Sequence, residues 1–440
     1  MLLLYSDIDS PRVDYIFKLV FTELLGLPFE QTRQKELFKN HAGPTLGYSA
    51  SRVNNEFFIC CTNFLQPGPV LPFDVPVAAG EQIHLFPTAG SDLPFDIFAA
   101  VFYMVSRYEE YLPFVPDQHG RFTSSSSLAS KHNFVLKPVV NEWVAQLRVL
   151  LAYKFPELSF PSRHFSALVT YDIDVAYEFK GRSLLRNTLS LGKDLITFNF
   201  KRVKERQAVL NGTTTDSWDT YGYIINTIKQ YNLEAIFFFL VGRYSAQNKN
   251  LAATSTPMKE LIRRIAALCA IGIHPSYSSS LNPGMIIAEK QTLETVAGNP
   301  IKASRQHFLK FTLPHTYRYL VDAGITEDHS MGYADTPGFR AGICTPFYFY
   351  DLTMERATNL KIYPITCMEG NFVKYMKISP GESIAMIHDL LLRIQAVNGL
   401  FISLWHNHTL GDKGLYKGWK RVHEEMIKKI VLLKKDKPPQ

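Results

Sequence analysis

The sequence predicts an α/β protein with a mainly parallel sheet or barrel, and two observations support this prediction. From about residue 166 onward, short apolar segments alternate with segments whose apolar residues repeat every three or four positions. Strands that alternate with helices in this way are typical of parallel sheets. Several acidic, histidine and arginine residues follow the apolar segments directly, at the strand ends where such folds place their active sites.

The length of the chain predicts two domains, because 440 residues exceed the roughly 100–200 residues of one typical domain. Residues 1–160 hold short apolar segments broken by proline and glycine, and we expect a smaller α/β N-terminal domain there. Within it, residues 56–61 predict a strand, and residues 96–111 and 138–151 predict helices. Residues 155–165 contain two prolines and predict a linker. Residues 161–440 then form the second domain.

The second domain has a regular order of expected elements. The expected strands are residues 166–170, 234–241, 271–274, 304–308, 362–366 and 400–405, and the expected helices are residues 220–231, 258–270 and 313–323. At the C-terminus, Trp419, Val422, Met426, Ile430 and Leu433 follow helical spacing and predict a final helix that ends before Pro438.

The positive charge is local. The formal net charge is +7, from 47 Lys and Arg against 40 Asp and Glu, and residues 417–440 hold eight basic and three acidic residues. Five of the seven charges therefore lie in the final helix, whose apolar stripe can dock on the protein. The charge therefore gives no reason to expect a nucleic-acid partner, while contact of this basic helix with an anionic membrane or a lipid-linked substrate stays open.

Cysteine usage and hydropathy indicate the compartment. The chain has five cysteines, an odd number, and no CxxC pair, which argues against a disulfide framework or a zinc knuckle. The first residues lack the basic start and apolar run of a secretory signal, and residues 235–241, the longest apolar run elsewhere, are too few to span a membrane. We expect a cytoplasmic protein without a transmembrane segment, and no feature of the sequence specifies an oligomeric state.

Asp172 and Asp174 are the most informative pair of residues. They end the expected strand at residues 166–170, and alternation along a strand places both side chains on one face. Two carboxylates on one face repel each other unless a cation or a proton lies between them. One can hold a metal ion while the other takes a proton from water. The alternative is a pair of solvated polar residues at a strand end.

Histidine and arginine residues follow three further expected strands. His274 stands at a strand end before a proline, as a metal ligand or as a packed structural residue. If residues 304–308 form a strand, Arg305 and His307 share a face, so that Arg305 could keep a carboxylate ionised and His307 could be a ligand. Either His406 or His408 could be a general acid at the end of the last strand, and we favour His406 because it is nearer the strand.

Together these residues resemble the polysaccharide deacetylase family with the NodB homology domain, from about residue 165 to the C-terminus. Residues 170–174, Thr-Tyr-Asp-Ile-Asp, resemble the first motif, Thr-Phe-Asp-Asp, and residues 235–239 resemble the Ala-Thr-Phe-Phe strand. Gly272-Ile273-His274 is similar to the start of the second motif, residues 305–308 stand where the family has Arg-x-Pro-Tyr, and Leu404-Trp405-His406 resembles the closing motif. Residues 106–122 resemble the uncharacterised domain that precedes such deacetylases in Bacteroidetes-type proteins.

The resemblance implies a distorted (β/α) barrel of about seven strands and a divalent metal, usually zinc, held by one Asp and two His. It implies hydrolysis of an acetyl group on a carbohydrate, with N-acetyl favoured. Asp172 would be the general base and Asp174 a ligand. Arg305 would orient Asp172, and His406 would protonate the leaving amine. His274 would be a second ligand.

The sequence departs from the family at one ligand position. The second histidine of the second motif should stand four residues after His274, where this chain has Ser278. Serine is a poor zinc ligand, so either His307 supplies the imidazole, or the site binds metal weakly, or it is not catalytic. We favour His307, because this chain has histidine where the family has proline. The expected metal ligands are therefore Asp174, His274 and His307.

Two other functions compete with the deacetylase hypothesis. One is a catalytically inactive carbohydrate-binding protein on the same fold. The other is a phosphohydrolase of the haloacid dehalogenase type, which would use Asp172 as nucleophile, but the chain has no Asp-Asp pair for Mg²⁺ and this chemistry leaves the histidines unused. Arg340, between Gly338 and Gly342, either binds an acidic substrate group or caps a turn.

Overall fold

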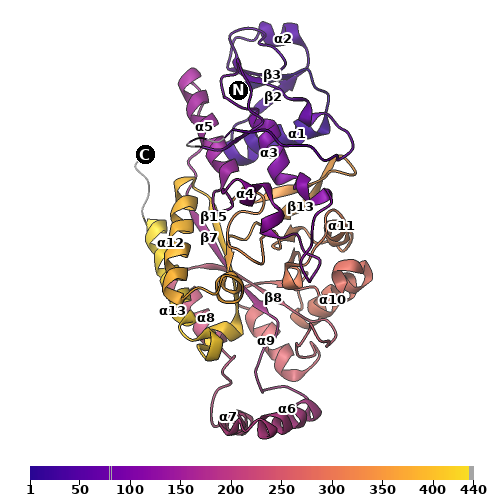
Figure 1. Ribbon diagram of the computed structural model, residues 1–440, viewed down its shortest axis with the longest axis vertical. Coiled ribbons are helices and arrows are strands. Elements are labelled where there is room, and N and C mark those ends of the chain that lie inside the picture. Colours follow the sequence, from indigo (N-terminus) through magenta and orange to yellow (C-terminus); the bar gives the residue numbers. More distant parts are fainter. Residues whose placement is uncertain (79, 81, 436–440) are drawn as a thin grey trace.

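Two sheets organise the computed structural model, which describes residues 1–78, 80 and 82–435 (Figure 1). The smaller sheet is entirely parallel, with the strand order β2-β1-β3-β4. Its strands are β1 (Leu2–Ser6), β2 (Phe29–Thr32), β3 (Thr45–Ser49) and β4 (Phe57–Cys60). The strand predicted at residues 56–61 is therefore confirmed as β4. A short antiparallel pair, β5 (Val77–Ala78) and β6 (His84–Leu85), follows.

The helices of the N-terminal part are α1 (Pro11–Phe17), which continues as a π-helix over Lys18–Leu25, α2 (Lys35–Lys39), α3 (Ile97–Val105), α4 (Leu128–Lys131) and α5 (Val139–Lys154). All nine residues of α3 are buried, because this helix is apolar on every side and packs against α1 and α5. It begins at the cap Asp96, whose carboxylate accepts the Ala99 N–H at 2.9 Å. It ends earlier than the predicted residue 111, because Arg107 takes a left-handed conformation and a 3-10 turn follows.

The larger sheet has the order β12-β13-β11-β10-β9-β8-β7-β15-β14. Its strands are β7 (Ser166–Ile173), β8 (Glu234–Phe239), β9 (Ala270–Ile273), β10 (Ala303–Ser304), β11 (Glu327–Asp328), β12 (Phe347–Asp351), β13 (Arg356–Ile362), β14 (Cys367–Met368) and β15 (Leu400–His406). All neighbours are parallel except β12 and β13. The predicted α/β class with a mainly parallel sheet is confirmed.

One stretch of chain links the two ends of this sheet. The strand predicted at residues 362–366 is displaced, because β13 already ends at Ile362. Just after it, the Tyr363 N–H donates to the Asp328 carbonyl of β11, and the Thr366 N–H donates to the Ile402 carbonyl of β15, both at 2.8 Å. A complete barrel of about seven strands stays a prediction, since the ladders of the described residues join nine strands into one sheet with β12 and β14 at its ends.

The helices around the larger sheet are α6 (Leu184–Ile196), α7 (Phe200–Leu210), α8 (Tyr221–Tyr231), α9 (Thr256–Ala266), α10 (Pro283–Ala297), α11 (His315–Asp322), α12 (Pro380–Ala396) and α13 (Trp419–Lys435). The predicted final helix is confirmed as α13, and its five-residue apolar stripe is buried, partly against α12. Pro438 lies outside the described residues. Because the stripe is buried, α13 offers mainly its lysines to a membrane. No described helix is long and apolar enough to cross a membrane.

A buried ion-pair network joins the N-terminal part of the chain to the part that forms the larger sheet. The Glu110 carboxylate accepts hydrogen bonds from Arg107 Nε at 2.8 Å and from Arg340 Nε and Nη2 at 2.8 and 2.6 Å. All three residues are buried, so Arg340 does not face a substrate, and its Nη1 donates to the Gly332 carbonyl in the loop after β11 at 3.0 Å. One hydrophobic core also contains residues of both parts of the chain. A domain boundary near residue 160 stays a prediction.

Candidate metal centre and active site

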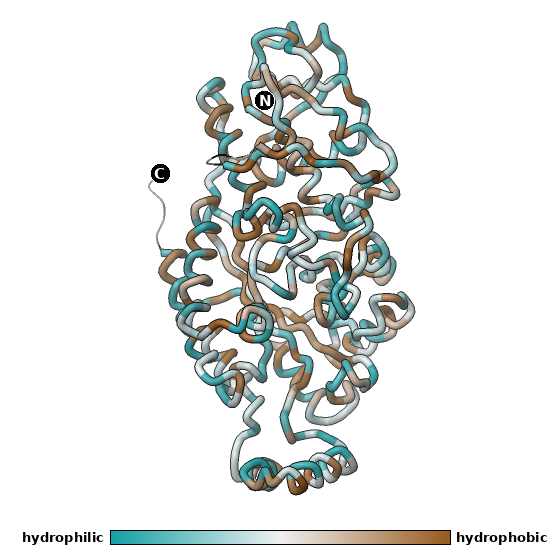
Figure 2. Tube along the Cα trace, in the orientation of Figure 1, coloured by the Kyte–Doolittle hydropathy of each residue, from teal (hydrophilic) through white to brown (hydrophobic). Residues whose placement is uncertain are grey.

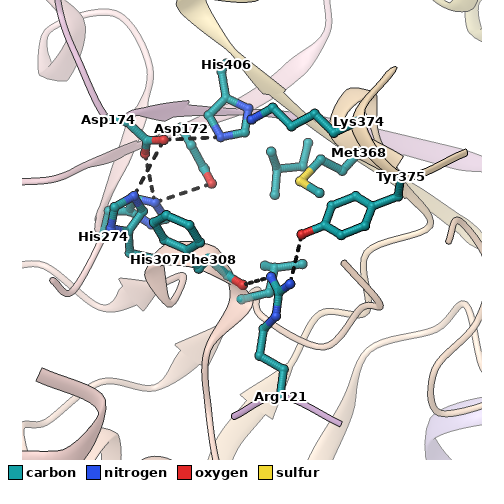
Figure 3. Close-up of a pocket in the computed structure, with 13 residues that line it drawn as sticks. Arg121, Asp172, Asp174, His274, His307, Phe308, Met368, Lys374, Tyr375 and His406 are labelled. Carbon is teal, nitrogen blue, oxygen red and sulfur yellow. Dashed lines mark hydrogen bonds and ion pairs between the residues drawn. The ribbon is translucent and has the colours of Figure 1, made fainter. Parts of the chain in front are cut away.

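The candidate site lies at the carboxyl ends of four consecutive parallel strands of the larger sheet. In the sheet β7 lies between β8 and β15, and β9 follows β8. Asp172 lies opposite His406 in the β7–β15 register, and His274 directly follows β9. Because the carboxyl ends of parallel strands meet at one edge, these side chains come together although Asp172 and His406 are more than 200 residues apart in sequence (Figure 3).

Asp174, His274 and His307 form a group that could hold a metal ion. One carboxylate oxygen and two imidazole nitrogens lie within 4.8 Å of one another. His274 Nε2 is 3.1 Å from Asp174 Oδ1, and His307 Nε2 is 3.6 Å from Asp174 Oδ2. Apart from this contact with each other, His274 Nε2 and Asp174 Oδ1 are buried and have no hydrogen-bond partner among the described residues. Buried nitrogen and oxygen atoms of this kind fit the ligands of a divalent metal.

Each histidine of this group is oriented through its other ring nitrogen. His274 Nδ1 lies 2.6 Å from the Arg305 carbonyl, which can only accept, so Nδ1 carries the proton and Nε2 is left as the metal-binding atom. His307 Nδ1 lies 3.2 Å from Asn248 Oδ1 in the same sense. Asn248 Oδ1 also accepts the Tyr277 N–H at 3.1 Å. The sequence reasoning missed Asn248, which has no periodic or motif signal.

The expected strand at residues 304–308 is wrong. β10 ends at Ser304, and His307–Leu309 form a 3-10 turn in which Phe308 has φ 62°. Arg305 and His307 therefore do not share a strand face. They still reach the same pair of carboxylates, Arg305 from the loop after β10 and His307 from the turn.

Asp172 and Asp174 have different partners. Asp172 is buried and accepts a hydrogen bond from Arg305 Nη1 at 2.8 Å. The Arg305 guanidinium is fully buried, donates from Nε to the His329 carbonyl at 2.9 Å, and lies over the Phe238 ring. Burial alone would raise the pKa of Asp174, but the charges of nearby histidines hold this pKa well below its usual value. Asp174 is therefore kept as an anion at the centre of the imidazoles.

His406 faces Asp174 from the other side of the group. Its Nε2 lies 3.4 Å from Asp174 Oδ2, and its Nδ1 lies 2.5 Å from Glu369 Oε1. Burial alone would lower the pKa of His406, but the carboxylates of Glu369 and Asp174 raise this pKa to about 9. By contrast, burial lowers the pKa of His408 to about 3, and His408 does not line the pocket. Glu369 was not expected from the sequence, although it directly follows β14.

A pocket of about 160 Å³ opens onto these residues. It is lined by Arg121, Asp172, Asp174, His274, His307, Phe308, Leu309, Met368, Gly370, Lys374, Tyr375, Leu404 and His406. Figure 3 shows Met368 and Tyr375 across the pocket from His274 and His307, with Phe308 beside His307. Arg121 comes from the N-terminal part, whereas Ser278 is exposed and does not line the pocket.

Comparisons with known proteins give a partial family match and distant structural likenesses. Residues 2–156 match the model of a family of unknown function, DUF7033. No curated protein matches the chain at a significant level. Similar solved structures include a Mycobacterium smegmatis protein provisionally named a polysaccharide deacetylase, with 16% identity, 61% of this chain and 86% of that chain covered, and a TM-score of 0.39.

Two further solved structures belong to Bacillus species. A polysaccharide deacetylase of Bacillus cereus is 12% identical, with 60% of this chain and 86% of that chain covered and a TM-score of 0.30. A CE4 family pseudoenzyme of Bacillus anthracis is 10% identical, with 60% and 61% covered and a TM-score of 0.29. Likenesses at these values assign no activity to the chain, so a function has to be argued from the site itself.

Proposed function

We propose that the chain is a metal-dependent hydrolase that removes an acetyl group, with N-acetyl favoured, from a carbohydrate. The observation that carries the proposal is the division of partners between two carboxylates on one strand end. Asp174 faces the Nε2 atoms of three histidines at 3.1–3.6 Å, whereas Asp172 is held by Arg305 at 2.8 Å and has one histidine, His274, at 3.6 Å. One carboxylate thus suits a metal and the other suits proton transfer.

Asp174, His274 and His307 would hold the metal, for which we propose zinc because two imidazoles and one carboxylate are a common zinc donor set. A bound zinc ion would polarise the acetyl carbonyl and favour ionisation of a water molecule near neutral pH. We include His307 in the ligand set, in place of the histidine that the family has at the position of Ser278. His307 Nε2 points to Asp174, and His307 Nδ1 is held by Asn248.

Asp172 would take the proton from the attacking water. The Arg305 guanidinium donates to Asp172 Oδ1, so that Oδ2, which lies 3.6 Å from His274 Nε2, is the oxygen left to accept a proton. Because Arg305 is itself fixed by the His329 carbonyl and the Phe238 ring, it holds Asp172 in one orientation. Arg305 would therefore act as a positioning residue for the base.

His406 would donate a proton to the leaving amine. The Glu369 carboxylate at Nδ1 stabilises the imidazolium, so His406 holds a proton on Nε2 toward the pocket at neutral pH. The aromatic and apolar rim formed by Phe308, Met368 and Tyr375 suits the apolar face of a sugar ring.

We also propose that the catalytic part is a deacetylase-like barrel preceded by an N-terminal domain, with a boundary near residue 160.

The site chemistry disfavours the two alternatives. A haloacid dehalogenase-type enzyme needs further carboxylates for Mg²⁺, and the only carboxylates among the described pocket-lining residues are Asp172 and Asp174. An inactive carbohydrate-binding protein has no need for the Asp172–Arg305 and His406–Glu369 pairs that prepare proton transfer. Activity measurements separate both from the deacetylase proposal.

The decisive experiment measures acetate release from chitooligosaccharides and acetylated monosaccharide precursors with added Zn²⁺ or Co²⁺. The wild type should release acetate, and Asp172→Asn should lose at least about 100-fold in kcat while it keeps its metal. Metal content of His274→Ala and His307→Ala should fall together. The exposed His315 provides the matched control, since His315→Ala should keep full metal content. Absence of bound metal in the wild type would overturn the proposal.

A further inference from the structure

A helical hairpin projects from the molecule at the end opposite to the N-terminal sheet (Figure 1). It consists of α6 and α7 and is inserted between β7 and α8. The insertion starts at the carboxyl end of β7, the strand end that carries Asp172. The hairpin is therefore connected to the edge of the sheet at which the pocket lies.

The two helices of the hairpin meet through polar side chains. The Arg206 guanidinium of α7 is buried and donates to Ser190 Oγ at 2.7 Å, to Asp194 Oδ2 at 2.5 Å and to Asn187 Oδ1 at 3.4 Å. Asn187, Ser190 and Asp194 stand at spacings of three and four residues, so they share one face of α6. That face, which a helix of a globular protein usually fills with apolar residues, is polar here.

Several described apolar side chains of the hairpin are exposed instead. Exposed fractions are 67% for Leu189, 79% for Ile196, 78% for Phe198 and 55% for Phe200. Leu189 and Ile196 are seven residues apart on α6, on the side away from Asp194. Phe198 lies in the turn between the helices and Phe200 begins α7, and their ring centroids are 6.2 Å apart. Figure 2 shows hydrophobic segments along the hairpin at this end of the molecule.

Polar contacts also fix the hairpin to the body of the protein. The Arg186 guanidinium lies 4.0 Å from the centre of the Tyr244 ring, and Arg202 Nη2 lies 3.0 Å from Glu178 Oε1. Lys413 forms an ion pair with Glu205. These contacts hold the polar side of the hairpin toward the protein, so the apolar side cannot turn inward without breaking them.

The hairpin carries a strong positive charge. Residues 182–210 contain seven basic and two acidic residues, an excess of five. Both acids are paired, Asp194 with Arg206 and Glu205 with Lys413. Lys193, Lys201 and Lys204 are exposed, and no acidic group of the described residues lies within ion-pair distance of them. Since residues 417–440 carry five further charges of the total +7, the rest of the chain is net negative by three.

We propose that the α6–α7 hairpin docks on an anionic membrane surface. Ile196, Phe198 and Phe200 enter the boundary between headgroups and acyl chains, and the unpaired lysines contact anionic headgroups. Outward apolar residues flanked by unpaired lysines match the two components of such a surface, whereas an apolar protein partner would leave the lysine charges uncompensated. The inference does not depend on the proposed deacetylase activity.

The test is co-flotation of the full chain with vesicles of phosphatidylcholine alone or of phosphatidylcholine with phosphatidylglycerol. The wild type should bind the anionic vesicles and bind less as salt increases. The double variant Ile196→Asp/Phe198→Asp should partition at least about tenfold less, because burial of one such side chain is worth more than a factor of ten. Lys201→Glu/Lys204→Glu should lose binding to the anionic vesicles.

Two matched variants control for general effects of the substitutions. Leu281→Asp changes a leucine that is 71% exposed elsewhere on the surface, and Lys434→Glu/Lys435→Glu changes two exposed lysines of α13. Both should bind as the wild type does. Wild-type binding of the hairpin variants, or loss of binding in the α13 variant, would overturn the proposal. A third outcome would also overturn it: the wild type binds no vesicles, light scattering shows a dimer, and Ile196→Asp/Phe198→Asp converts this dimer to a monomer. The apolar face would then contact a second copy of the chain.

Discussion

Arg121 Nη1 donates a hydrogen bond to the carbonyl of Phe308 at 2.7 Å, directly after the candidate metal ligand His307 (Figure 3). The same guanidinium donates from Nε to Asp117 at 2.8 Å and from Nη2 to Tyr375 Oη at 2.8 Å. Phe308 has a left-handed backbone with φ 62°, a conformation that non-glycine residues seldom adopt without support. A residue of the DUF7033-matched segment therefore supports the turn that places His307.

Arg121→Lys should weaken metal binding without unfolding the protein. Lysine keeps the charge, but one ammonium cannot replace the three directed contacts of the guanidinium, so the His307 turn should loosen. We expect the zinc affinity, measured by competition with a chelator, to fall about 10–100-fold. Arg148→Lys, at an exposed arginine of α5, should leave the affinity unchanged. Equal affinities of Arg121→Lys and the wild type would contradict this role of Arg121.

Glu369→Gln should lower kcat while the metal content stays at its wild-type value. Glutamine can still contact His406 Nδ1, but it removes the carboxylate charge that stabilises the imidazolium. The expected loss is about 10–100-fold in kcat on an acetylated sugar. Metal content and KM measured on the same preparation separate this effect from damage to the site. A parallel fall of metal content would show that Glu369 supports the ligands rather than the acid.

The strand-end residues of the site were predictable because their signals are local. An apolar run before Asp172, and another before His406, mark strands, and parallel strands bring their carboxyl ends to one edge whatever lies between them. The α13 stripe was predictable for the same reason, since helical spacing alone shows which residues are buried. The turn at Phe308 was not, because the alternation of residues 304–308 resembles a strand and only tertiary contacts favour the left-handed conformation.

The supporting residues of the site could not be predicted from the sequence. Asn248, Glu369 and Arg121 lie in loops or at the end of a two-residue strand, where no hydrophobic period marks their orientation. Each gains its role from a partner that is distant in sequence, such as the 187 residues between Arg121 and Phe308. Polar contacts of this kind depend on how loops from different elements converge, which a single sequence does not encode locally.

Glu110→Ala should strongly destabilise the fold. The substitution leaves the Arg107 and Arg340 guanidinium groups buried without their shared carboxylate, and breaking a buried pair costs about 3–5 kcal/mol. Equilibrium unfolding in urea should show this loss in the free energy of unfolding. Asp389→Ala removes an exposed partner of Arg393 and should cost at most about 1 kcal/mol. Similar losses in the two variants would mean that the buried network contributes no more than a surface pair.

His423 of α13 forms a buried polar contact that the proposed reaction does not use. Its Nε2 lies 2.9 Å from Tyr171 Oη of β7, and its Nδ1 lies 2.9 Å from Tyr223 Oη of α8. The side chain is fully buried, and burial lowers the pKa of His423 from 6.5 to about 3. The neutral imidazole therefore links the final helix to the central strand.

The stability of the protein should fall as the pH drops below 6.5, and His423→Gln should reduce this dependence. Below the unfolded-state pKa of 6.5, the unfolded chain binds a proton at His423 that the folded chain does not bind until about pH 3. The free energy of unfolding should thus decrease by about 1.4 kcal/mol per pH unit from this group. Urea unfolding in the presence of a chelator, at several pH values below 6.5, measures the slope. His423→Gln should lower the slope of the free energy of unfolding against pH by the contribution of one proton. The slope should stay above zero, because burial also lowers the pKa values of His329 and His408, to about 4 and about 3. The exposed His315→Gln variant should keep the wild-type slope, and an unchanged slope in His423→Gln would mean that the buried imidazole is protonated in the folded protein.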